Sequence, residues 1–81
     1  MNYAETKDKL SEIINARLVA TGNERHPLED ATALLGGSLP LDSLELAVVV
    51  LEMTKMTSRD PFASGFIEFQ TLGELARLYA D

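Results

Sequence analysis

The 81-residue sequence predicts a single all-α domain, a small bundle of three to four helices that covers residues 1–81. Three observations support this fold class. Apolar residues recur at helical spacing in two long segments and one shorter segment. N-terminal cap signals precede the later two of these segments. The 46% hydrophobic content is that of a globular chain, and the length allows one modest core.

Residues from Tyr3 to about Ala20 are expected to form the first helix. Leu10, Ile14 and Leu18 fall on one apolar stripe, together with Ile13. The sequence Thr21-Gly22-Asn23 then supplies a stop signal, because glycine readily adopts the left-handed conformation that closes helices.

Residues 24–41 show no sustained periodicity, since prolines and glycines interrupt the segment. We expect a long loop with a short helical turn near residues 28–35. A loop of this length in a small domain is usually functional or packed. The leucines of this loop are expected to anchor it to the core: Leu28, Leu34, Leu35, Leu39 and Leu41.

A second long helix is predicted from Asp42 to about Thr57. The run from Ala47 to Leu51 would also suit a buried strand, because β-branched residues favour strands. The length of the segment, its lack of glycine and proline, and the preceding cap favour a helix. Apolar residues occupy much of its circumference, so we expect more than one face to be covered.

Ser58 to Gln70 is expected to be irregular, with a short third helix capped by Asp60-Pro61. Thr71-Leu72-Gly73-Glu74 has the form of a capping box and should open the last helix. The predicted core draws apolar residues from all of these segments: Leu10, Ile14, Leu18, Leu34, Leu44, Val48, Leu51, Phe62, Phe66, Leu75 and Leu78.

A serine stands at the predicted start of the second long helix. Asp42 is a strong N-cap residue, and Glu45 can reach back to the cap amide. Ser43 would lie in the first turn, near solvent, beside free amides and the positive end of the helix dipole. This setting suits a serine that carries a phosphate ester, although Asp-Ser is also an ordinary helix start.

The segment Leu34-Leu35-Gly36-Gly37-Ser38-Leu39-Pro40-Leu41-Asp42-Ser43-Leu44-Glu45 resembles the attachment segment of acyl carrier proteins. The resemblance implies that a phosphopantetheinyl transferase moves 4'-phosphopantetheine from coenzyme A onto Ser43. It also implies that Asp42 caps and orients the helix, and that Leu44 matches the hydrophobic position after the serine. The terminal thiol of the arm would hold acyl groups as thioesters for a ketosynthase and an acyltransferase or acyl ligase. Such a carrier serves a type II fatty-acid or polyketide pathway.

The serine helix departs from the common fatty-acid-synthase carriers, which keep several further acids there. Glu52 is the one acid that remains along it, and Lys55 carries the opposite charge. We therefore expect a specialised pathway whose enzymes contact a more apolar helix, through Leu44, Glu45 and Met53 or Met56. Each of these residues has an alternative role, as a cap for Glu45 and in core or helix packing for the others.

Several function classes are disfavoured by the sequence. His26 is the one histidine, and no Gly-x-Ser-x-Gly elbow or metal-ligand spacing is present, so we expect no enzyme and no metal site. A net charge of −6 disfavours nucleic acid. No apolar run is long enough for a membrane span, and the absence of cysteines and of a signal-peptide pattern suggests the cytoplasm. We expect a monomer.

Two other functions fit the same residues. An aminoacyl or peptidyl carrier would share the serine helix but would be loaded by an adenylating enzyme. A helical interaction module would use an apolar groove and would be indifferent to Ser43→Ala. Whether the bundle shelters the cargo of a carrier is open from the sequence.

Overall fold

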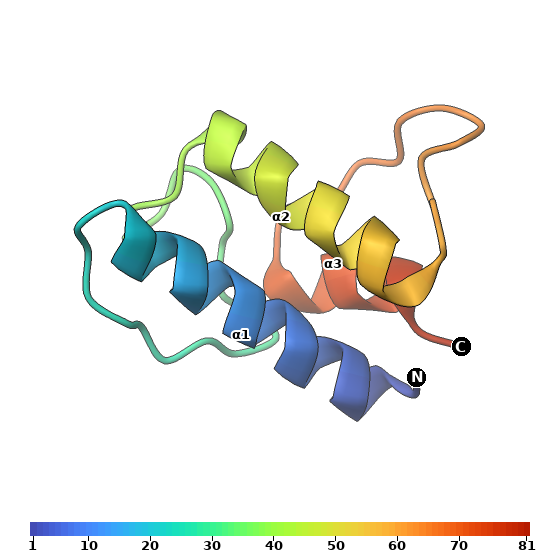
Figure 1. Cartoon of the computed structure of the whole chain (residues 1–81), viewed down its shortest axis with the longest axis horizontal. Coiled ribbons are helices and arrows are strands. Elements are labelled where there is room, and N and C mark those ends of the chain that lie inside the picture. Colours follow the sequence, from blue (N-terminus) through green and yellow to red (C-terminus); the bar gives the residue numbers. More distant parts are fainter.

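The computed structural model describes all 81 residues and contains three helices and no β-strand, which confirms the all-α prediction. The helices are α1 (Tyr3–Ala20), α2 (Ser43–Thr57) and α3 (Leu72–Tyr79). α1 and α2 run antiparallel side by side, and the shorter α3 packs against α1 behind them (Figure 1). No helix has the length and apolar character needed to cross a membrane.

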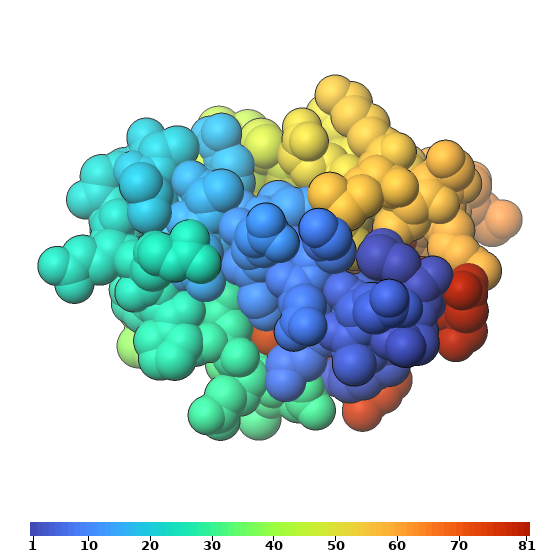
Figure 2. Space-filling view, turned by 60° about the horizontal axis from the view of Figure 1, so that its bottom comes forward, coloured from blue at the N-terminus to red at the C-terminus, as the bar shows by residue number.

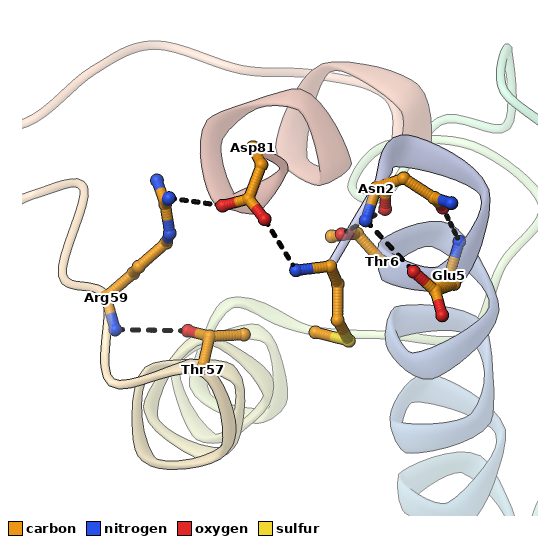
Figure 3. Close-up of polar contacts among 7 residues, drawn as sticks. Asn2, Glu5, Thr6, Thr57, Arg59 and Asp81 are labelled. Atoms are coloured by element: carbon orange, nitrogen blue, oxygen red, sulfur yellow. Dashed lines mark hydrogen bonds and ion pairs between the residues drawn. The ribbon is translucent and has the colours of Figure 1, made fainter.

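α1 has the predicted boundaries, and local hydrogen bonds define its start. The Asn2 side-chain oxygen accepts from the Glu5 amide at 2.8 Å, and a Glu5 carboxylate oxygen accepts from the Asn2 amide at 3.1 Å (Figure 3). This reciprocal capping box satisfies amides that the helix itself leaves unpaired. Gly22 follows the helix with φ of 86°, the conformation that the predicted stop requires.

The core forms where the apolar faces of the helices meet the loop leucines. Leu10, Ile14 and Leu18 of α1 are fully buried, as predicted, and so are Leu34 and Leu75. The expected loop anchors Leu39 and Leu41 are buried too, whereas Leu35 is 47% exposed, so its predicted core contact was wrong. The core also contains buried residues that the prediction did not include: Leu46, Val49, Met53, Leu72, Ala76 and Tyr79.

The prediction of which α2 face is buried was wrong. Leu44 and Leu51 are 72% and 54% exposed, whereas Leu46, Val49 and Met53 are buried. Because nine of the fifteen residues of the helix are apolar, six of them in the unbroken run 46–51, hydrophobic spacing alone left its rotation about the axis undetermined. α1 and Tyr79 of α3 both contact α2, as expected for a helix covered on more than one face, but Leu44 and Leu51 leave an apolar strip open.

Tyr79 joins α3 to α2 as well as filling the core. Its ring is buried, and its hydroxyl donates to the Val50 carbonyl at 3.2 Å and lies 3.1 Å from the Thr54 hydroxyl oxygen. These contacts hold the last turn of α3 against the middle of α2. They therefore fix the position of α2, which carries part of the candidate site described below.

In the long loop of residues 21–42, the helical turn expected near residues 28–35 is reduced to a single hydrogen-bonded turn, in which the Thr32 amide donates to the Glu29 carbonyl at 3.0 Å. The loop backbone instead pairs with the chain entering α3: the Leu34 amide donates to Gln70 O and the Leu72 amide to Thr32 O, both at 2.9 Å. The pairing gives one isolated antiparallel bridge between Ala33 and Thr71. Backbone groups committed to this bridge cannot also form a helical turn.

The expected short helix after Asp60 is also absent. The Asp60 carboxylate accepts from the Phe62 amide at 3.1 Å, and two turn hydrogen bonds follow, from Ala63 N to Asp60 O and from Gly65 N to Phe62 O. Gly65 then takes φ of 132° and turns the chain away before a helix can propagate. The predicted fourth helix is therefore replaced by two turns and an irregular, phenylalanine-rich segment that continues to Gln70.

The two ends of the chain lie side by side (Figure 1). The Met1 ammonium contacts the Asp81 carboxylate at 2.9 Å, and Arg59 pairs with the other Asp81 oxygen (Figure 3). On this side of the molecule, α1 lies between the loop that follows it and the C-terminal part of α2 (Figure 2).

Candidate functional site

Ser43 is the first residue of α2, and its surroundings are set by the cap. Asp42 has extended backbone, and its carboxylate accepts from the Glu45 amide at 2.8 Å. The Asp42 carbonyl accepts the first helical hydrogen bond, from Leu46 N at 3.0 Å. The amides of Ser43 and Leu44 form no hydrogen bond. An exposed hydroxyl therefore stands next to two free donors at the positive end of a helix.

Glu45 does not complete the predicted capping box. Its carboxylate accepts instead from Arg17 Nε at 2.7 Å, so the acid joins the start of α2 to the last turn of α1. The Glu45 side chain is only 17% exposed. Because Arg17 already occupies it, a basic partner group would have to compete for this carboxylate.

The two predicted hydrophobic contact residues lie in opposite settings. Leu44 projects from the helix start with 72% of its surface exposed, so the alternative of a core anchor is wrong for it. Met53 is fully buried and cannot present a surface to another protein, which corrects the prediction of a contact there. Met56 is 50% exposed and is the methionine that remains available on α2.

An apolar pocket of about 630 Å³ opens beside Ser43. This volume lies within the range of small-ligand sites, about 300–1,000 Å³. Nine of its eleven lining residues are hydrophobic, and they come from the loop, α2 and the segment before α3: Ala33, Leu34, Leu35, Ser43, Leu46, Ala47, Val50, Phe62, Phe66, Phe69 and Gln70.

The α2 wall of the pocket is one helical face. Ser43, Leu46, Ala47 and Val50 are spaced at i, i+3, i+4 and i+7, so they lie in line along the helix. With a rise of 1.5 Å per residue, this face extends about 10 Å from the serine. The spacing was visible in the sequence, but the same helix offers other apolar faces with equally good spacing.

The opposite wall is a cluster of three phenylalanine rings. Centroids of Phe62, Phe66 and Phe69 are separated by 5.8, 5.9 and 6.1 Å, the range of mutual aromatic packing. Phe66 is 78% exposed, so its predicted core position was wrong, whereas Phe62 is half-buried and packs against the edge of the core. The concentration of aromatic residues was the sequence signal for this wall, but nothing in the sequence indicated that it faces Ser43.

His26 lies in the loop, outside this pocket. The Asn15 side chain forms two hydrogen bonds with the backbone of His26: it accepts from the amide at 2.7 Å and donates to the carbonyl at 3.1 Å. The imidazole Nδ1 is 3.0 Å from Glu24 O. No hydrogen bond joins the Ser43 hydroxyl to a histidine or a carboxylate, and the carboxylate of the adjacent Asp42 accepts from the Glu45 amide. The structure contains no group of three or more potential metal ligands.

Comparisons with protein-family models, with curated proteins and with solved structures found no match to this chain. What the site can do is therefore argued from its geometry. An exposed hydroxyl with free amides suits a covalently attached anionic group, and the neighbouring pocket suits an apolar one. A single ligand with a phosphate at one end and an apolar group at the other would satisfy both features.

Proposed function

We propose that the chain is an acyl carrier protein: Ser43 bears a 4'-phosphopantetheine arm that moves thioester-bound acyl groups between enzymes. The observation that carries this proposal is the position of Ser43, which stands at the free N-terminus of α2 and on the rim of a 630 Å³ apolar pocket. A modification with both anionic and apolar parts accounts for the two features together.

The residues present fit such an arm. The Ser43 side chain is exposed, so a bulky phosphodiester meets no neighbour that would have to move. The unpaired amides of Ser43 and Leu44 suit its negative charge. The Asp42 carboxylate is held by the Glu45 amide, which keeps the helix start in one orientation. When bound, the group supplies a terminal thiol that forms thioesters.

We assign attachment to an external enzyme, because the Ser43 hydroxyl is not hydrogen-bonded to any base of this chain and the adjacent Asp42 carboxylate serves as the helix cap. In the proposed transfer, the Ser43 oxygen forms a bond to the phosphorus that bears the pantetheine unit of coenzyme A. The pyrophosphate P–O bond breaks, adenosine 3',5'-bisphosphate leaves, and the hydroxyl proton passes to a base of the transferase. The chain thus acts as the substrate of a phosphopantetheinyl transferase and is not itself an enzyme.

The bundle supports the acyl-carrier type of fold, with a long packed loop leading into the serine helix. We assign the later steps to a ketosynthase and an acyltransferase or acyl ligase of a type II fatty-acid or polyketide pathway in the cytoplasm. Leu44 and Leu51, seven residues apart on α2, form an exposed apolar strip near Ser43 on which such enzymes would dock. Glu52 and Lys55 lie within 4.0 Å of each other and offer them little net charge.

Intact-protein mass spectrometry after incubation with coenzyme A and a broad-specificity phosphopantetheinyl transferase tests the proposal. We expect the parent chain to gain the mass of one phosphopantetheinyl group, and Ser43→Ala to gain none. Ser38→Ala is the matched control, because it removes another exposed serine from the same region and should still be modified. A folded parent chain that resists several transferases would overturn the proposal.

The exposed apolar strip also supports a second candidate, a helical interaction module that carries no cofactor. In that case a partner would bind over Leu44 and Leu51 irrespective of Ser43. Retention of function in Ser43→Ala would favour the module. An aminoacyl or peptidyl carrier passes the same mass test, and loading by an adenylating enzyme would distinguish it.

A further inference from the structure

The pocket beside Ser43 has two unlike walls. On the α2 side, Ala47 contributes a single methyl group between the larger Leu46 and Val50. On the other side stand the rings of Phe62, Phe66 and Phe69. Phe62 and Phe66 are within 15° of parallel, while Phe69 is tilted by 42–44° to both. The pocket is therefore a slot between an aliphatic helix face and an aromatic wall.

Phe66 is the exposed edge of this wall. It lines the pocket, yet 78% of its surface contacts solvent. Large apolar side chains that stay exposed around a cavity mark a surface that is covered by a ligand or a partner. The segment that carries Phe66 is held by few backbone hydrogen bonds, since Phe66 to Phe69 form none. The ring can therefore adjust to an occupant without disrupting a helix.

The lining also restricts the charge of the occupant. Ser43 and Gln70 are the polar lining residues, and neither is charged. An ionised group placed inside would lose hydration without gaining an opposite charge, which is strongly unfavourable. The occupant is therefore uncharged, and the polar groups available to it are those of Ser43 and Gln70.

Resting on the proposed function, we infer that this pocket receives the acyl end of the Ser43 arm and that Phe62, Phe66 and Phe69 select planar acyl groups, aromatic or conjugated, over saturated ones. Aromatic rings gain energy beyond simple burial when they pack offset or edge-to-face against other rings. All three rings line the pocket, and Phe69 is tilted by 42–44° to the other two, so the wall offers a guest ring more than one packing orientation. Attachment at the pocket rim would keep the guest at high local concentration.

Binding to the unmodified chain tests this selectivity without relying on the arm. The neutral probe N-phenyl-1-naphthylamine, which fluoresces in apolar sites, is displaced by two synthetic ligands of the same skeleton. These are S-(6-phenylhexanoyl)pantetheine and S-(6-cyclohexylhexanoyl)pantetheine, which differ only in a flat against a puckered ring. We expect the phenyl ligand to bind about two- to tenfold more tightly, although the cyclohexyl ligand is the more hydrophobic.

Variants locate the source of the preference. Phe66→Leu keeps an apolar side chain at an exposed position, so the fold should survive, and we expect the phenyl preference to shrink by at least half on a logarithmic scale. Ile67→Leu is the matched control, because Ile67 is 44% exposed, adjacent in sequence and absent from the pocket lining. It should retain the full preference.

The outcomes separate this inference from the carrier function. Equal binding of the two ligands to the parent chain, or an unchanged preference in Phe66→Leu, overturns the inference even if Ser43 is modified in the mass assay. A clear phenyl preference in a chain that no transferase modifies overturns the carrier function and leaves a pocket selective for free planar ligands. The preference should also persist in Ser43→Ala, since the serine supplies only the rim.

Discussion

Asp42 and Ser43 have different roles at the start of α2. Asp42 turns its carboxylate to the helix and closes onto the Glu45 amide, whereas Ser43 leaves its hydroxyl in solvent. The cap is thus structural, and the serine is free for chemistry. Substitutions at the two positions should therefore affect different measurements.

Asp42→Ala should lower the free energy of unfolding by about 1 kcal/mol, because a helix amide loses its capping acceptor. Asp42→Asn keeps an oxygen in the same place and should stay close to the parent chain. Urea unfolding followed by circular dichroism measures both. Equal losses for alanine and asparagine would show that the negative charge matters more than the capping oxygen.

Met53→Ala should cost about 2–5 kcal/mol, since it opens a cavity in the core. Met53 is fully buried, whereas Met56, three residues later on the same helix, is 50% exposed. Met56→Ala should therefore change the stability by less than about 0.5 kcal/mol. The same unfolding assay compares the two, and a Met53 variant as stable as the parent would contradict the assigned core position.

Between elements, the strongest polar link is the one from α1 to α2. Arg17 and Glu45 are partly sheltered, with side chains 35% and 17% exposed, and their atoms meet at 2.7 Å. The pair fixes the start of the serine helix against the end of α1. Tyr79 does the same for the middle of α2 from beneath. The pocket wall is held between these two attachments.

A double-mutant cycle with Arg17→Ala and Glu45→Ala should give a coupling energy of about 1 kcal/mol, between the values for exposed ion pairs and for charged hydrogen bonds. The pair Glu52–Lys55 is the control, because its atoms are 4.0 Å apart and its side chains are 48% and 66% exposed. Its coupling should be close to zero. Similar couplings for the two pairs would show that sheltering does not strengthen the interhelical link.

For the whole molecule, acid is the condition to which stability should be most sensitive. A hydrogen bond from Lys7, at 2.8 Å, lowers the pKa of Asp30. Hydrogen bonds from the amides of Gln70 and Thr71 and from the Thr71 hydroxyl lower the pKa of Glu74. Both carboxylates therefore release protons more readily in the folded than in the unfolded chain.

A folded-state pKa below the unfolded value contributes stability that is present above the unfolded pKa and is lost as the pH falls through the folded pKa. We therefore expect the melting temperature to be steady near neutral pH and to fall between about pH 5 and pH 2. Glu74→Gln should be less stable than the parent at pH 7 but lose less on acidification. A pH profile identical to that of the parent would exclude Glu74 from the acid response.

The helix boundaries and the position of Ser43 could be predicted from the sequence because caps, stop signals and apolar spacing act within one or two turns. Asp42, Thr71 and Gly22 mark these boundaries through their own hydrogen bonds or backbone conformation. Most of the loop leucines also followed from the sequence, since Leu34, Leu39 and Leu41 are buried and Leu28 is half-buried, but Leu35 is 47% exposed. The helical turn expected near residues 28–35 is a single hydrogen-bonded turn, and the short helix expected after Asp60 did not form, because distant backbone pairing and a glycine turn limit these two segments.

Neither the rotation of α2 about its own axis nor the existence of the pocket could be predicted from such local sequence signals. A helix that is apolar around much of its circumference has no preferred face until α1, α3 and the loop pack against it. In this chain the packing buries Met53 and leaves Leu44 and Leu51 exposed to solvent. The aromatic wall likewise comes to face Ser43 only because the chain before α3 pairs with the loop at Ala33. Local chemistry therefore specified the serine at its helix start, whereas long-range packing produced the cavity beside it.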